Sequence, residues 1–208
     1  MAKWDANIEA RNKPEFEFDV HKEFHDIISR TTFGSNFSKG KQIFELQEIV
    51  DECKTFYIAG KETTANLLTC LILGLHQEWQ NKAREEVDRV CGQHAFPCAD
   101  NLADLKITLP SSSNAVHHDV RIWGEDANVF NPMRFLEPRN HLASFFPFGL
   151  GPQICVGQNL AIVEAKIALA MIVGRYSFVV SPSYVHAPMK LLTMQPQYGA
   201  QMIFKRRS

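Results

Sequence analysis

One cysteine, Cys155, lies in a segment rich in glycine and aromatic residues. Residues 145–157 read FFPFGLGPQICVG, and an apolar helical pattern follows directly. The glycines permit backbone conformations and close approaches that a Cβ would block. The helix dipole and unpaired backbone N–H groups stabilise the thiolate of a cysteine just ahead of a helix. Such a thiolate suits the proximal position of an iron porphyrin, and the alternative is a small cysteine buried in a tight turn.

A second segment, residues 59–64 with the sequence AGKETT, lies in the middle of a long helical pattern. Gly60 costs the helix backbone entropy, and the hydroxyl of Thr63 competes for backbone carbonyls. The weakened turn could open a groove for a small ligand, flanked by the carboxylate of Glu62 and a threonine hydroxyl. Those two groups could relay protons to bound oxygen, while the simpler interpretation is a kink tolerated for packing.

Helical periodicity must position both segments. Asp19 is a suitable cap for a helix that ends at the turn of residues 31–34. Apolar residues recur at helical spacing from 38 to 75, which predicts one long buried helix or a break near Gln47. Further helices are predicted at 77–89, closed by Gly92, and at 157–174.

Short β-branched and aromatic runs after Tyr176 predict a small terminal sheet. Its expected strands are residues 178–180, 191–194 and 202–204. Residues 1–14 are polar, and we expect them to pack loosely. The predicted fold class is mainly α with a small β portion.

Composition excludes several classes of protein. The 208 residues include 22 Lys+Arg and 23 Asp+Glu, for a net charge of −1, and 45% are hydrophobic. These values argue against disorder and against a surface for nucleic acid or anionic membranes. Five cysteines without a C-x-x-C pair argue against a disulfide scaffold or a zinc module. No secretory signal and no bilayer-spanning stretch is evident, so we expect a soluble intracellular chain.

Other residue groups have weaker functional interpretations. His117, His118 and Asp119 could form a metal site, but adjacent residues rarely converge on one ion, so we rank this option last. The remaining histidines are assigned no role. Trp4, Trp79 and Trp123 are expected to serve packing.

Together, the cysteine segment and the AGKETT segment resemble the cytochrome P450 family. The pattern Phe148-x-x-Gly151, followed by Cys155-x-Gly157, resembles its haem-thiolate signature, and residues 59–64 resemble its oxygen-activating motif. Residues 130–135 (FNPMRF) are similar to the segment that precedes the haem loop. Strings such as residues 27–35 (IISRTTFGS) resemble plant microsomal members, in a subgroup that oxidises steroids and terpenoids.

The resemblance implies a role for each matching residue. Cys155 would be the axial ligand of the haem iron, and Phe148 would pack beside its sulfur. Gly149, Gly151 and Gly157 would shape the loop around the cofactor.

On the opposite side of the haem, Glu62 and Thr63 would deliver protons, while Ala59 and Gly60 would make room for oxygen. Arg134 would join a structural charge cluster. The implied reaction inserts one oxygen atom from O2 into a C–H bond of a small hydrophobic substrate, with electrons from an NADPH-dependent reductase.

The sequence also departs from the family's pattern. Segments of the family's pattern are missing near 47–48 and 106–115, so we expect residues 1–208 to form a single, incomplete P450 domain. Gln153 stands where an arginine usually contacts a haem propionate. The Glu86-x-x-Arg89 string belongs to the preceding charged helix, which leaves Arg134 without its expected partners.

These departures leave two functions open. One is a haem-thiolate monooxygenase, and the other is a non-catalytic truncated remnant or isoform with weak or no haem binding. The family's members of this type sit on the endoplasmic reticulum through an N-terminal anchor, and no anchor is evident in these 208 residues. The substrate is not predicted, because the segments that would shape the pocket are missing.

Overall fold

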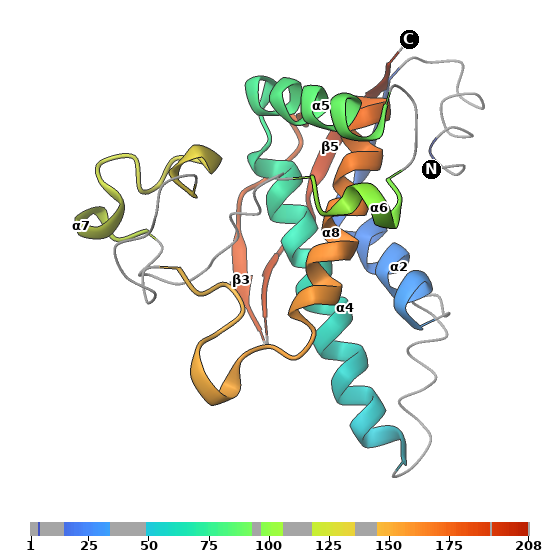
Figure 1. Cartoon of the computed structure of the whole chain (residues 1–208), viewed down its shortest axis with the longest axis vertical. Helices are drawn as coiled ribbons and strands as arrows, with labels where there is room; N and C mark the ends of the chain where they lie inside the picture. The colour runs from blue at the N-terminus through green and yellow to red at the C-terminus, as the bar shows by residue number, and fades with distance from the viewer. Residues whose placement is uncertain are drawn as a thin grey trace.

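The long helices pack side by side in the computed structural model, which describes residues 4, 15–33, 49–92, 97–105, 118–135, 145–191 and 193–207. Helices α2 (Val20–Phe33) and α8 (Gln158–Arg175) both pack against α4 (Ile49–Gly74), and α5 (Gln77–Cys91) packs against α8 (Figure 1). Helix α4 is therefore the central element, as the long apolar pattern predicted. Gln47, the site of the alternative break, lies outside the described residues.

The helix ends follow the predicted caps. Asp19 Oδ1 accepts hydrogen bonds from the backbone N–H groups of His21 at 3.0 Å and Lys22 at 3.4 Å, at the start of α2. Gly92 closes α5 with a φ of 82°, and its N–H donates to the carbonyl of Asp88. Polar side chains and a glycine in the left-handed region thus satisfy backbone groups that the helices leave unpaired.

An antiparallel sheet in the order β1-β5-β2 lies beside the bundle. Its strands are β1 (Glu15–Asp19), β5 (Gln201–Arg206) and β2 (Tyr176–Val180). A separate hairpin pairs β3 (Pro188–Lys190) with β4 (Met194–Pro196). The terminal sheet was predicted, but the proposed strand at 191–194 is wrong, because the N–H of Leu191 donates to the carbonyl of Thr193 in the hairpin turn.

Strand β1 was not predicted at all. Its sequence, EFEFD, alternates aromatic and acidic residues, which is the pattern of a strand with one buried face. Phe18 stacks on Phe204 of β5 at 4.9 Å between ring centroids, and Trp4 packs 4.7 Å from Phe18 and 5.2 Å from Phe204. The expected packing role of Trp4 is confirmed.

One hydrophobic core joins the sheet to the helices. It contains Phe24 and Ile28 of α2, Leu68 and Ile72 of α4, and Leu169 of α8. These side chains recur every three to four residues along their helices, so each helix presents one apolar stripe to the core. The fold class, mainly α with a small β portion, is confirmed.

The remaining described segments are short. They form α6 (Ala99–Leu102), α7 (Val120–Trp123) and the 3-10 turns η2 (Pro132–Phe135) and η4 (Gly151–Gln153). Residues 34–48 and 106–117, where the two internal losses are predicted, lie outside the described residues. Among the helices that the structure describes, none combines the length and apolar character needed to cross a bilayer.

Arg134 differs from the expectation of a poorly partnered guanidinium. It donates to the carbonyls of Asp126, Val129 and Asn131 at 2.6, 3.0 and 3.2 Å. It also lies 3.1 Å from the Asp126 carboxylate and over the ring of Trp123. Local backbone carbonyls therefore replace the partners that were expected from a distant helix.

Candidate functional site

The loop before α8 is shaped by two glycines and one backbone contact. The N–H of Cys155 donates to the carbonyl of Phe148 at 2.8 Å, which closes the loop on itself. Gly149 and Gly151 have φ values of 80° and 70°, in the left-handed region that other residues rarely adopt. A Cβ at Gly149 would also lie 3.2 Å from the carbonyl oxygen of Gln153, so this turn requires glycine.

Cys155 is exposed at the start of α8. Helix α8 begins three residues later, and the N–H of Ala161 donates to the carbonyl of Gly157. A Cβ added at Gly157 would lie 3.9 Å from the sulfur of Cys155. The alternative of a small cysteine buried in a tight turn is therefore wrong for this position.

Large apolar side chains are also exposed around the thiol. Val156 is 89% exposed, and the others are Leu150, Ile154, Leu160 and Val163. Exposed apolar groups beside a thiol that can become an anionic ligand fit a flat, apolar, metal-centred group such as haem. Gln153 is exposed too, so its amide could donate a hydrogen bond there, but it has no charge.

The AGKETT segment lies inside α4. The helix continues through Ala59, Gly60, Glu62 and Thr63, and the Thr63 hydroxyl donates to the Ala59 carbonyl at 2.5 Å. This side chain to backbone bond is the competition predicted for threonine in a helix. Ala59 and Thr63 are exposed, whereas Glu62 is partly buried.

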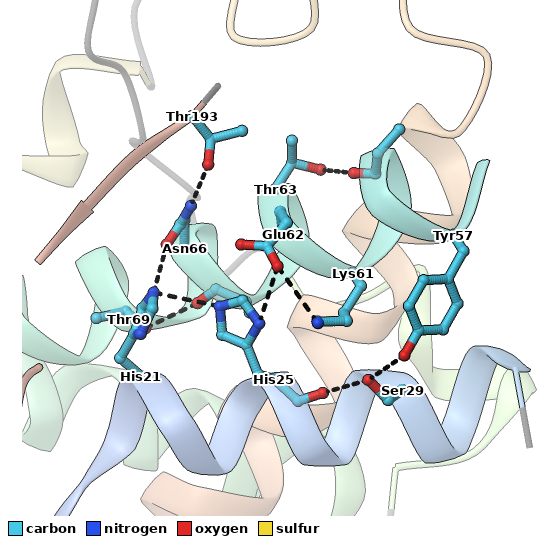
Figure 2. Close-up of polar contacts among 12 residues, drawn as sticks. His21, His25, Ser29, Tyr57, Lys61, Glu62, Thr63, Asn66, Thr69 and Thr193 are labelled. Atoms are coloured by element: carbon cyan, nitrogen blue, oxygen red, sulfur yellow. Dashed lines mark hydrogen bonds and ion pairs between the residues drawn. The ribbon is translucent and has the colours of Figure 1, made fainter. Parts of the chain in front are cut away.

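Glu62 faces α2 through a polar contact with His25. Its Oε1 lies 3.4 Å from His25 Nδ1 and 3.3 Å from Lys61 Nζ, and only 24% of its side chain is exposed. His25 Nε2 in turn lies 3.2 Å from His21 Nε2, and His21 Nε2 lies 2.9 Å from Asn66 Oδ1. Figure 2 shows the two imidazole rings in line between Asn66 and Glu62.

The His25 ring is neutral at neutral pH. Burial, followed by the charges of His21 and Lys61, lowers the pKa of His25 from 6.5 to about 3. Its side chain is only 8% exposed. The contact between His25 and Glu62 is therefore one between a neutral imidazole and a carboxylate, and not an ion pair.

Asn66 connects this network to the β3–β4 hairpin. Its Nδ2 donates to Thr193 Oγ1 at 3.1 Å, across 127 positions of sequence. No role for His21, His25 or Asn66 was predicted from the sequence. The spacing of the two histidines, four residues apart on one helix, was the signal that could have found the pair.

The structure groups the predicted site residues into two sets. Ala59, Gly60, Glu62 and Thr63 share one stretch of α4, and the residues around Cys155 share the loop that leads into α8. Helices α4 and α8 pack against each other, so the fold joins the elements that hold the two sets. In Figure 1 the cysteine loop, in orange, extends from the start of α8.

Residues 118 and 119, the alternative metal site, have other partners. Asp119 caps α7 and pairs with Arg121 at 2.6 Å, and the Arg121 hydrogen bonds lower the pKa of this carboxyl to about 2. His118 Nδ1 lies 3.1 Å from Asn128 Oδ1. In the part of the chain that the structure describes, no three His, Cys, Asp or Glu side chains gather as metal ligands would. His117 lies outside that part.

Comparison with known proteins identifies the family. The family model described as Cytochrome P450 matches residues 5–111 and 109–204. The chain is 42% identical to cytochrome P450 CYP749A22 of Panax ginseng, over 86% of this chain and 43% of the relative. It is 42% identical to cytochrome P450 734A6 of Oryza sativa subsp. japonica, over 78% of this chain and 38% of the relative. It is 43% identical to cytochrome P450 72A397 of Kalopanax septemlobus, over 86% of this chain and 43% of the relative.

These matches place the chain in the class of the cytochromes P450. The chain belongs to the cytochrome P450 family, as its resemblance predicted. Members of that family are in general haem-thiolate monooxygenases that use a reductase and a small-molecule substrate. The chain spans about two fifths of the length of the curated relatives that it matches.

Proposed function

We propose that this chain binds haem through Cys155 and acts as a monooxygenase. It would insert one oxygen atom from O2 into a C–H bond of a small hydrophobic substrate, with electrons from an NADPH-dependent reductase. The observation that supports this function most is the loop before α8, where an exposed thiol lies among exposed apolar side chains. The fixed backbone of this loop, in which Gly149 and Gly151 hold conformations that cost other residues free energy, supports a role in binding.

Each residue of the two sets has a role in this proposal. Cys155 holds the iron, Phe148 packs beside the sulfur, and Gly157 leaves the sulfur accessible. The bound haem supplies the oxidising chemistry. On α4, Glu62 and Thr63 hold and move the protons that the reaction consumes, while Ala59 and Gly60 present a surface without large side chains.

A second candidate is a truncated, non-catalytic member that binds haem weakly or not at all. The alignment to the ginseng relative favours it, because that alignment is 224 residues long although it includes only 86% of this 208-residue chain. The relative therefore has internal residues with no counterpart here. The family model also matches in two segments that meet at residues 109–111, inside the predicted loss at 106–115.

The carbon monoxide difference spectrum of the purified, haem-supplemented chain tests the first function. A cysteine-ligated ferrous haem gives the thiolate-type Soret band, and Cys155→Ser should abolish it while the far-UV circular dichroism stays unchanged. Cys98→Ser, at another exposed cysteine, is the matched control and should keep the band. A wild-type protein without the thiolate band contradicts haem-thiolate binding. A band without substrate oxidation in the presence of reductase favours the non-catalytic member.

A further inference from the structure

Glu62 is approached from α2 by a histidine whose ring nitrogen Nδ1 has no hydrogen bond. That nitrogen is buried, and Glu62 Oε1 lies 3.4 Å from it. The opposite nitrogen, Nε2, contacts His21. A neutral imidazole carries one proton, so the arrangement of its neighbours decides which nitrogen holds it.

The contacts favour one tautomer for each ring. A bare Nδ1 on His25 would direct its lone pair at the Glu62 carboxylate, which is unfavourable, so the proton belongs on Nδ1. The bare Nε2 of His25 then accepts from the Nε2–H of His21. His21 Nε2 also lies 2.9 Å from Asn66 Oδ1, so its single N–H is shared between two acceptors, Asn66 Oδ1 and His25 Nε2.

This assignment gives the three residues a direction. His21 donates to His25, and the protonated Nδ1 of His25 lies 3.4 Å from the next acceptor, Glu62 Oε1. Lys61, on the other side of the carboxylate, contacts the same oxygen at 3.3 Å. Figure 2 shows the second carboxylate oxygen of Glu62 pointing away from the His25 ring. A proton could therefore arrive at one oxygen of Glu62 while the other serves a different partner.

Building on the role proposed for Glu62, we propose that His25 is a positioning residue that holds this carboxylate against α2 and, together with His21, passes it a proton from solvent. In this step the His21 Nε2 proton moves to His25 Nε2, and the His25 Nδ1 proton moves to Glu62 Oε1. His21 takes a replacement proton from water on its Nδ1. One proton is transferred in total and each ring ends with one proton; exchange of the ring protons with water then restores the starting tautomers.

The environment of His25 suits such a relay better than charge storage. The low pKa of its ring means that a proton does not remain on His25 as positive charge. His21 is only partly buried, at the start of α2, so it is the member of the pair that meets solvent. Ser29 and Tyr57 lie beside His25 at this interface: Tyr57 donates to Ser29, and Ser29 donates to the His25 carbonyl.

Long-range 1H–15N correlation NMR of the 208-residue chain, labelled with 15N-histidine at pH 7, tests the proposal without haem. We expect His25 protonated at Nδ1 and His21 protonated at Nε2. In His21→Phe, the His25 Nδ1 proton should exchange with solvent at least tenfold more slowly, because its route is removed. His186→Phe, outside the network, should leave both the tautomers and the exchange rate unchanged.

Other outcomes overturn the proposal. Protonation of His25 at Nε2 would leave Nδ1 without a proton to transfer to Glu62. An exchange rate that is unchanged in His21→Phe would remove His21 from the proton path. His25→Asn keeps a donor that can hold the Glu62 carboxylate but cannot relay a proton. This variant therefore retains the positioning role of residue 25 and removes its role in proton transfer. None of these measurements depends on haem, so they fail or succeed separately from the carbon monoxide spectrum.

Discussion

The α2–α4 interface and the cysteine loop hold the two halves of the proposed site in opposite ways. At the interface, Glu62 is fixed by buried neighbours on two helices, and the polar network continues to the β3–β4 hairpin. In the loop, the backbone is fixed by glycines and a carbonyl contact, while Cys155 and its apolar neighbours are exposed. One half is complete within the protein, and the other presents a surface that a ligand would cover.

Because one region is buried and the other exposed, substitutions in the two regions should have different effects on stability. Side chains of the interface are part of the core, so changing them alters the free energy of unfolding whether or not a ligand is bound. Side chains of the loop are exposed and contribute little to that core, so changing them should alter the free energy of unfolding much less. A matched pair of substitutions, one in each half, can therefore test the contrast.

The largest effect is expected for Leu68→Ala in α4. Leu68 is fully buried in the core, whereas Leu160, in the first turn of α8, is 53% exposed. Leu68→Ala should lower the free energy of unfolding by about 2–5 kcal/mol, because it removes buried methyl groups and leaves a cavity. Leu160→Ala should change it by less than about 0.5 kcal/mol. Urea denaturation of the haem-free chain measures both, and equal losses would contradict the contrast.

Intermediate effects are expected for two Gly→Ala substitutions, which should change the free energy of unfolding in opposite directions. Gly149→Ala should destabilise the loop by about 1–2 kcal/mol, because alanine is strained at a φ of 80°. Gly174→Ala, in α8, places its Cβ 3.9 Å from Val87, an ordinary contact, and should stabilise the helix by up to about 1 kcal/mol. Thermal unfolding followed by circular dichroism checks both signs. A Gly149→Ala variant as stable as the wild type would mean that the loop glycine has no special conformational role.

The sequence predicted the helices well, because each carried local signals. Asp19 marked the start of α2 and Gly92 marked the end of α5, and both effects act within a few residues. Strand β1 was missed although EFEFD alternates, because its partner β5 lies almost two hundred residues away. The misplaced strand at 191–194 has a local cause: its apolar residues fit a strand, but Leu191 and Thr193 lie in the turn that joins β3 to β4.

The site was predicted in part for the same reason. Cys155 and the AGKETT segment could be found because their residues are contiguous in sequence. The His25–Glu62 contact could not, because the two residues are on different helices and meet only when α2 packs on α4. The sequence also suggested that Arg134 would lack partners, and nearby carbonyls, which no side-chain motif reveals, supply them.

The smallest effect is a change of stability with pH that depends on His25. Its pKa is about 3 in the folded chain and near 6.5 when unfolded, so the unfolded state binds more protons between these values. Folding stability should therefore fall as the pH decreases below 6.5, by at most about 1.4 kcal/mol per pH unit from this residue. His25→Leu removes this titration. The unfolding free energy of the wild type, taken relative to that of the variant, should therefore fall steadily from pH 7 to pH 5. His186→Leu, at an exposed histidine, should show no such trend. A difference between wild type and His25→Leu that is constant over this range would mean that His25 titrates alike in both states, and the interface would then be as open to water as the cysteine loop.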